Sequence, residues 1–132
     1  MKPAVVFLFC LLALTAKTQL PGSDVDARYS HLEKEGVNMS QKLAYTYFFY
    51  SDDMDALKDF YKTRLKNVYD LVKIDFKQGD GYLMEVRETE KHSRISLKKR
   101  IGMLAEQSAK TKKVKFNSWN VNGKDGKSLY KD

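Results

Sequence analysis

Cysteine is nearly absent from this sequence: one residue, Cys10, occurs among 132. It lies in an apolar N-terminal run that is interpreted below as a removed signal, so the rest of the chain cannot form a disulfide. Secreted domains of this size are often held together by disulfides. Stability is therefore expected to come from a packed core, an oligomer interface or a bound ligand.

Histidine is also scarce, since His31 and His92 are the only two in the chain. No cysteine remains after the signal, and the acids show no ligand spacing. The two histidines therefore predict no metal site. His92 and Ser93 are adjacent, but adjacency does not supply the geometry of a base and a nucleophile, and Ser93 is better explained as a helix cap. No glycine-rich phosphate loop is present either. We therefore predict no catalytic residue, no metal and no cofactor, and favour a binding protein over an enzyme.

Long apolar runs are missing after Ala16, so no transmembrane segment is expected there. At the N-terminus, Lys2 precedes an apolar stretch, residues 4–16, that ends in small residues. This is the order of a secretory signal peptide, and the stretch is shorter than the about 20 residues that span a bilayer. We predict a signal peptide at residues 1–18, cleaved after Ala16 or Thr18, and a secreted, extracellular protein without a nucleic-acid partner. An uncleaved anchor or a buried helix is the alternative interpretation.

Positive charge exceeds negative charge, with 24 lysines and arginines against 17 acids. The excess is concentrated between Lys91 and Lys115, where nine basic residues accompany one acid, Glu106. Such a surface suits polyanions such as glycosaminoglycans, an anionic membrane surface or an acidic partner. The plainer interpretation is a solvated surface. The residues predicted to form the basic patch are Lys98, Lys99, Arg100, Lys112 and Lys113.

The chain after the signal has the usual length of one domain. Residues 19–36 are predicted to be a flexible lead-in, because Pro21-Gly22-Ser23 interrupts regular structure there. Residues 37–132 are predicted to form a single domain. Asn38-Met39-Ser40 is an N-glycosylation sequon, which predicts a modification site at Asn38 and fits a secreted protein.

The first part of the domain is rich in aromatic residues, and its secondary structure is open to two interpretations. Leu43, Tyr47 and Tyr50 recur at i, i+4 and i+7, which predicts a helix that starts at residue 37 or 40 and ends at Tyr50. A strand is the competing interpretation, because aromatic residues favour strands. We prefer the helix.

The following elements are better defined. Asp52 can cap a helix, whose apolar face would consist of Met54, Leu57, Tyr61, Leu65 and Val68. From about residue 72 the apolar period changes to two on both sides of Gly79-Asp80-Gly81, which is typical of a β-hairpin. Ser93 then opens another helix, and a strand with a bulge in its middle follows over residues 114–121. This order predicts an α+β fold with N-terminal helices packed on a small antiparallel sheet.

The order of elements also resembles the NTF2-like cone fold, in which two helices precede a hairpin, a third helix follows, and long strands curl round the helices to enclose a pocket. The segments that carry the resemblance are Tyr47-Phe48-Phe49 before Asp52 and Asp53, Leu57, Phe60-Tyr61, the hairpin, the helix over 95–104 and the strand over 114–121. The resemblance covers residues 38–130. Because one strand and a stub follow the last helix, it implies a shortened, incomplete cone or a sheet that a partner completes. Enzymes of this family use an Asp or His base and a tyrosine donor; no residue here matches that motif, and an NTF2-like enzyme remains the further alternative.

Aromatic residues are the most suggestive candidates for a binding surface. The five aromatic side chains between Tyr45 and Tyr50 cannot all enter one core from a single helix. Apolar pockets with a few hydroxyl groups suit small lipophilic ligands, and tyrosine is common at interfaces. We predict a secreted binding or interaction protein whose partner is a small lipophilic ligand or a protein, a second copy included. The residues predicted to line its pocket or interface are Tyr45, Phe48, Phe49, Tyr61 and Trp119.

Overall fold

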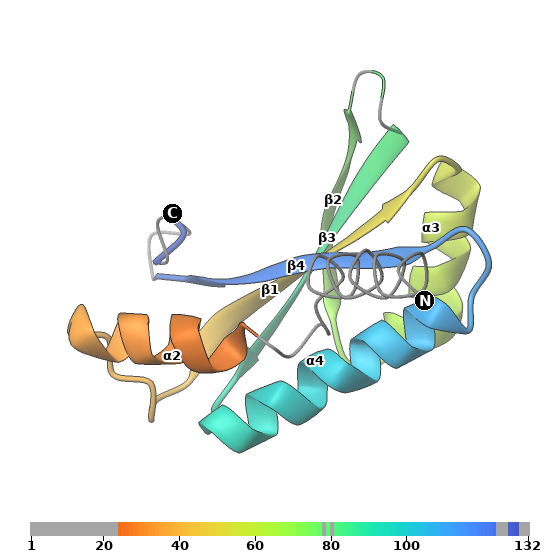
Figure 1. Ribbon diagram of the computed structural model, residues 1–132. Coiled ribbons are helices and arrows are strands. Elements are labelled where there is room, and N and C mark those ends of the chain that lie inside the picture. Colours follow the sequence, from red (N-terminus) through yellow and green to blue (C-terminus); the bar gives the residue numbers. More distant parts are fainter. Residues whose placement is uncertain (1–23, 78, 80, 124–126, 130–132) are drawn as a thin grey trace, which may run out of the picture.

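Three helices and a four-stranded antiparallel sheet make up the part of the chain that the computed structural model describes, residues 24–77, 79, 81–123 and 127–129 (Figure 1). In chain order the elements are α2 (Val25–Lys34), β1 (Leu43–Ser51), α3 (Met54–Phe60), its π-helical continuation η1 (Tyr61–Leu65), β2 (Asp70–Lys77), β3 (Gly81–Glu90), α4 (Arg94–Ala109) and β4 (Lys115–Asn122). The fold is α+β, as predicted. The predicted signal peptide at residues 1–18 and Cys10 lie outside the described residues.

The strands lie in the order β2-β3-β1-β4, and every neighbouring pair is antiparallel. From β1 onward the chain therefore follows a βαββαβ path in which β3 returns beside β1 and β2 takes the edge. This is the split βαβ arrangement of ferredoxin-like folds. Helix α2 precedes it as an additional element.

The aromatic segment predicted as a helix is the central strand β1, so that preference was wrong and the competing interpretation holds. Leu43, Tyr45, Tyr47 and Phe49 alternate along it and are buried. Strand β1 is hydrogen-bonded on both sides, to β3 and to β4, and β-branched and aromatic residues pack well in such a position. A strand sends its aromatic side chains alternately to both faces, which a helix with one buried stripe does not do.

The resemblance to the NTF2-like cone relied partly on a helix at Tyr47-Phe48-Phe49. That part of its basis is removed, since these residues belong to β1. The family assignment itself stays a prediction.

All three helices cover the same face of the sheet, and the core lies between them and the strands (Figure 1). Phe60 of α3 packs on Phe49, and Arg28 of α2 lies over the ring of Trp119 on β4. The largest fully buried side chains are Tyr45, Tyr47, Phe49, Phe60, Leu32, Leu57, Leu65, Met84, Leu97, Ile101, Leu104 and Val25. The opposite face of the sheet has no helix over it in the described part of the chain.

Helix α2 lies within residues 19–36, the stretch predicted as a flexible lead-in. Val25, Tyr29 and Leu32 are buried by the core. Their spacing of i, i+4 and i+7 is itself a helix pattern, and it begins directly after the Pro21-Gly22-Ser23 interruption. The packed part of the chain therefore starts before residue 37.

The remaining predicted elements are present, but Val68, predicted on the apolar face of the helix after Asp52, lies past the end of η1 and is 55% exposed. Helix α3 is capped by Asp53, whose carboxylate accepts hydrogen bonds from the amides of Asp55 and Ala56, rather than by Asp52. Ser93 caps α4 in a capping box with Ser96. Strand β4 has the predicted bulge, because its register with β1 shifts between Phe48 and Phe49. None of the described helices combines the length and the apolar character needed to cross a membrane.

Candidate functional site

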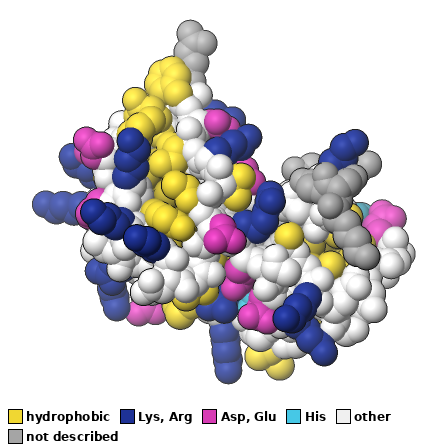
Figure 2. Space-filling model, turned by 180° about the vertical axis from the view of Figure 1, so that it is seen from behind, with side chains coloured by type: hydrophobic (Ala, Val, Ile, Leu, Met, Phe, Trp, Pro, Cys, Tyr) yellow, Lys and Arg dark blue, Asp and Glu magenta, His cyan; other side chains and the backbone are white. Residues whose placement is uncertain are grey.

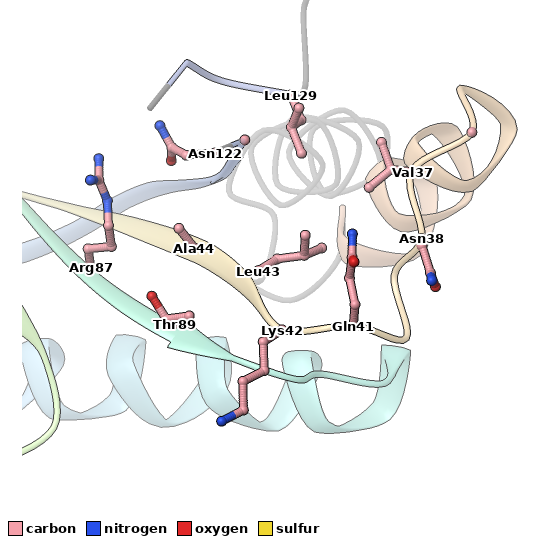
Figure 3. Close-up of a pocket in the computed structure, with 12 residues that line it drawn as sticks. Val37, Asn38, Gln41, Lys42, Leu43, Ala44, Arg87, Thr89, Asn122 and Leu129 are labelled. Carbon is pink, nitrogen blue, oxygen red and sulfur yellow. The ribbon is translucent and has the colours of Figure 1, made fainter. Parts of the chain in front are cut away.

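The uncovered face of the sheet carries a cavity of about 660 Å³ at the end where β1 begins (Figure 3). Its floor consists of residues from three strands, and its walls come from the loop over 36–42 and the segment over 127–129. Small-molecule sites typically have volumes of about 300–1,000 Å³. The lining residues are Gly36, Val37, Asn38, Gln41, Lys42, Leu43, Ala44, Arg87, Thr89, Asn122, Gly123 and Leu129.

The alternation of the strands places Arg87 and Asn122 on the face of the sheet opposite the described helices. Tyr45 on β1 is directly opposite Glu88 on β3 and Val121 on β4, and all three are buried on the helix side. Successive residues of a strand point to opposite faces. Arg87, next to Glu88, and Asn122, next to Val121, therefore point toward the cavity. The cavity is thus a consequence of the same pattern that builds the core.

Apolar groups form much of the cavity wall. Val37 and Leu129 pack against the edge of the core, and Leu43 and Ala44, at the start of β1, also line the cavity (Figure 3). Leu129 is held there by its backbone amide, which donates to the carbonyl of Val121 at 2.6 Å. These residues would bury the apolar body of a ligand.

Arg87 supplies the positive charge of the cavity. Its guanidinium lies beside Asn122 in Figure 3, whereas the ammonium group of Lys42 points away from the space between the labelled side chains. The guanidinium contacts Glu85 Oε2 at 3.3 Å and Thr46 Oγ1 at 3.5 Å. Thr46 is buried beneath it, and its hydroxyl donates to Asn122 Oδ1. Arg87 is therefore anchored against the sheet, and none of the described lining residues is acidic.

A second group of polar residues is buried on the other face of the sheet, around Glu88. One carboxylate oxygen, Oε2, accepts hydrogen bonds from the Tyr47 hydroxyl at 2.6 Å and from Arg100 Nε at 3.1 Å. The same oxygen lies 3.0 Å from His92 Nε2. His92 Nδ1 in turn lies 3.0 Å from Ser96 Oγ, and the ring of Tyr45 packs edge-on against His92.

The pKa values in this cluster reflect burial and mutual contact. Burial alone would raise the pKa of Glu88, but hydrogen bonds from His92 and Tyr47 and the charge of Arg100 outweigh it and lower that pKa below its ordinary value. Burial, followed by the nearby Glu88 carboxylate, raises the pKa of Tyr47 far above its usual range. Burial also raises the pKa of Tyr69 to about 12. Near neutral pH the cluster therefore holds an ionised carboxylate among neutral tyrosines.

The contacts of Glu88 connect the sheet to helix α4. Glu88 belongs to β3, Tyr47 to β1, and Arg100 to α4, so that one carboxylate joins the centre of the sheet to the longest described helix. Glu88 and His92 are almost completely buried and do not line the described cavity. The residues around Glu88 thus hold the scaffold together on one face, while Arg87 is presented on the other.

The aromatic residues predicted as a binding surface are divided between several places. Tyr45, Phe49 and Trp119 belong to the core under the helices. Tyr61 is half-buried, and its hydroxyl donates to the carbonyl of Tyr69 at 2.8 Å. Phe48 is half-buried and alternates with these core residues toward the uncovered face. None of the five is among the described residues that line the cavity.

Three of the five residues predicted as a basic patch are engaged by acids. Lys98 contacts Asp26, and this contact, more than burial, sets the pKa of that carboxyl below its ordinary value. Arg100 contacts Glu88, and Lys113 lies 3.4 Å from Asp53. Lys99 and Lys112 are exposed.

Asn38, the predicted glycosylation site, is exposed at the rim of the cavity. Its side-chain oxygen accepts hydrogen bonds from the amide and the hydroxyl of Ser40. Use of the sequon stays a prediction. In the described residues no three histidine or acidic side chains are grouped so that they could hold a metal ion.

The sequence alone did not single out Arg87. The alternation of the hairpin strand does place Arg87 and Glu88 on opposite faces, and this signal could have been followed further. The cavity, however, also needs β1 beside β3, and the helix predicted from residue 37 or 40 to Tyr50 excludes that pairing. Compared with protein-family models and with curated proteins, the sequence matches none. Function is therefore inferred from geometry.

Proposed function

We propose that this chain is a secreted binding protein that holds a small organic anion with an apolar body in the cavity on the uncovered face of its sheet. The observation that carries the proposal is Arg87, an anchored cation in a cavity that has apolar walls and no acidic residue among its described lining. Arginine binds carboxylates and phosphates through charge-assisted, often paired hydrogen bonds.

The apolar walls favour a ligand such as an alkyl carboxylate over a fully polar ion. Val37, Leu43 and Leu129 offer apolar contact that inorganic anions cannot use. Pockets of this kind combine mostly apolar walls with a few polar groups that fix the ligand's orientation. Asn122 and Thr89 supply such groups beside Arg87. The predicted small lipophilic ligand is thus retained in a more specific form, as an anion.

The alternative of a polyanion-binding surface is less well supported by the arrangement of charges. Lys98, Arg100 and Lys113 already contact acids of the same chain. A long polyanion would have to compete with these three ion pairs, whereas a ligand in the cavity would compete with one, between Arg87 and Glu85.

Titration calorimetry with decanoate and with the neutral analogue decanol tests the proposal. We expect decanoate to bind the wild-type protein, and Arg87→Gln to weaken that binding about tenfold or more, because hydrogen bonds to charged groups contribute about 1.5–3 kcal/mol. Decanol should bind both proteins with similar affinity, since it lacks the charge that Arg87 recognises.

Arg64→Gln is the matched control, because Arg64 is an exposed arginine on η1 outside the cavity lining. It should bind decanoate like the wild type. Equal decanoate affinity in Arg87→Gln and Arg64→Gln, or no saturable binding to the wild-type protein, would contradict the proposal.

A further inference from the structure

Among the described residues, no strand pairs with the outer side of β2, which is therefore an edge of the sheet. It lies at one end of the strand order, and the β2–β3 hairpin projects beyond the helices (Figure 1). The other edge strand, β4, is partly occupied, because Asn122 forms a bridge with Ser128 of the returning chain. An edge strand presents backbone groups that can pair with another strand. Edge β2 is therefore the place where the sheet can be extended.

Exposed apolar side chains are concentrated on and beside this edge. Six large hydrophobic side chains are exposed in the described part of the chain, and four of them lie within nine consecutive positions: Val68, Leu71, Val72 and Phe76. Phe76 is 63% exposed. Figure 2 shows a continuous strip of hydrophobic side chains that runs down from the end of the molecule carrying the hairpin. Contiguous apolar patches on a monomer commonly mark an interface.

The pairing of β2 with β3 shows how its side chains are divided between the two faces. Ile74 is opposite Met84, which is buried on the helix side, and Phe76 is opposite Tyr82. Lys73 and Asp75 lie between them on the other face, and they form an ion pair at 3.2 Å. Between Lys73 and Lys77, one face of the edge strand thus carries Ile74 and Phe76, and the other carries a cation and an anion two residues apart. The register with β3 shifts between Leu71 and Lys73, so this alternation begins at Lys73.

We propose that a second copy of this chain pairs with this edge, β2 against β2, antiparallel and centred on Ile74. In this register Ile74 faces Ile74 of the other copy. On the opposite face of the sheet, Lys73 of each copy faces Asp75 of the other. The strand is self-complementary, as the two-fold symmetry of a homodimer requires, and the two sheets join into one.

Charge selects this register over its neighbours. A shift of two residues in one direction places Lys73 opposite Lys73, and a shift in the other direction places Asp75 opposite Asp75. Like charges directly opposite each other in a sheet are unfavourable. A shift of one residue would place the apolar face of β2 in one copy beside the charged face of β2 in the other. The sequence of β2 therefore specifies the centred alignment.

This inference is independent of the proposed ligand site. None of the described residues lining the cavity belongs to β2. The described part of the chain has no disulfide to stabilise it. The dimer would stabilise it by covering apolar residues that the single chain leaves exposed to solvent.

Sedimentation velocity from about 1 µM to about 1 mM tests the dimer over the affinity range of weak interfaces. We expect the wild-type protein to dimerise within this range. Lys73→Asp should weaken dimerisation about tenfold or more, because it places two acids opposite each other twice in each dimer. The double charge swap Lys73→Asp/Asp75→Lys should restore it, and Lys99→Asp, an equal charge change at an exposed position of α4, should have no such effect.

A cross-linking measurement fixes the alignment. In a Cys10→Ser background, Ile74→Cys should form a disulfide-linked dimer under mild oxidation, because opposed residues of antiparallel strands have Cα atoms about 4.5–5.5 Å apart, within the reach of a disulfide. Lys99→Cys should remain monomeric on the same gel. A protein that stays monomeric throughout the concentration range, or a dimer that ignores Lys73→Asp or resists cross-linking at position 74, would overturn the proposal.

Discussion

At the scale of single residues, two neighbours in sequence have separate tasks. Arg87 faces the cavity and Glu88 faces the core, because adjacent residues of a strand point to opposite sides. The Glu88 carboxylate accepts from Tyr47 and Arg100, so its charge is compensated although it is almost completely buried. Loss of this charge would leave Arg100 without its acidic partner. Substitutions of Glu88 and of Arg87 should therefore separate the stability of the fold from the proposed ligand binding.

Replacing Glu88 tests the role of the cluster. Glu88→Gln should lower the free energy of unfolding by about 2 kcal/mol, since hydrogen bonds to a charged group contribute about 1.5–3 kcal/mol. Urea unfolding followed by circular dichroism measures this change. The control is Glu106→Gln, which removes an exposed partner of Lys110 and should cost about 0.5 kcal/mol or less. Equal effects of the two substitutions would contradict the structural role of Glu88.

The dependence of stability on pH follows from the lowered pKa of Glu88. A carboxyl whose pKa is lower in the folded than in the unfolded state stabilises the fold above its unfolded pKa, and this contribution is lost as the pH falls through the folded pKa. The ordinary value for Glu is 4.5. The difference in unfolding free energy between wild type and Glu88→Gln should therefore be largest near neutral pH and shrink below about pH 4.5. Urea titrations at several pH values would detect this; a difference that stays constant into acid would contradict it.

At the scale of elements, the predictable features were those fixed by local chemistry. Ser93 caps α4 as predicted, and the change of apolar period near residue 72 marks the hairpin, whereas the cap of α3 is Asp53, one residue after the predicted Asp52. Strand β1 was missed because its aromatic residues satisfy two periods at once. Its structure is decided by pairing with β3 and β4, which are about 30 residues or more away in sequence, and no local pattern contains that information.

The turn of the hairpin contains a close approach that only glycine allows. Gly81 has φ +85°, and a Cβ atom there would lie 2.7 Å from the carbonyl oxygen of Ser51. Gly79 has φ +81°, but a Cβ atom there would meet nothing within 4 Å. Gly79→Ala should therefore lose about 1 kcal/mol from the unfavourable φ alone, and Gly81→Ala at least about 1 kcal/mol more from the clash. Thermal unfolding of the two variants compares them, and equal losses would show that the contact with Ser51 is unimportant.

At the scale of the whole molecule, the described helices all cover one face of the sheet, and the proposed binding cavity lies on the other. The fold class could be predicted from the order of elements. The cavity could not, because its lining comes from the loop over 36–42, three strands and the segment over 127–129, and only their tertiary arrangement brings these together. The predicted aromatic residues have mostly structural positions, since Tyr45, Phe49 and Trp119 fill the space under the helices. In the proposed function, a cation beside apolar walls replaces them as the basis of recognition.

The location of the ligand can be measured directly by mapping amide chemical-shift changes while decanoate is added to the isotopically labelled protein. The largest saturable changes should occur at Ala44, Arg87, Thr89 and Asn122, which share the floor of the cavity. They should disappear in Arg87→Gln at the same decanoate concentration. Saturable changes centred instead on the helix side of the sheet or on strand β2, or their persistence in Arg87→Gln, would contradict the assignment of this cavity as the binding site.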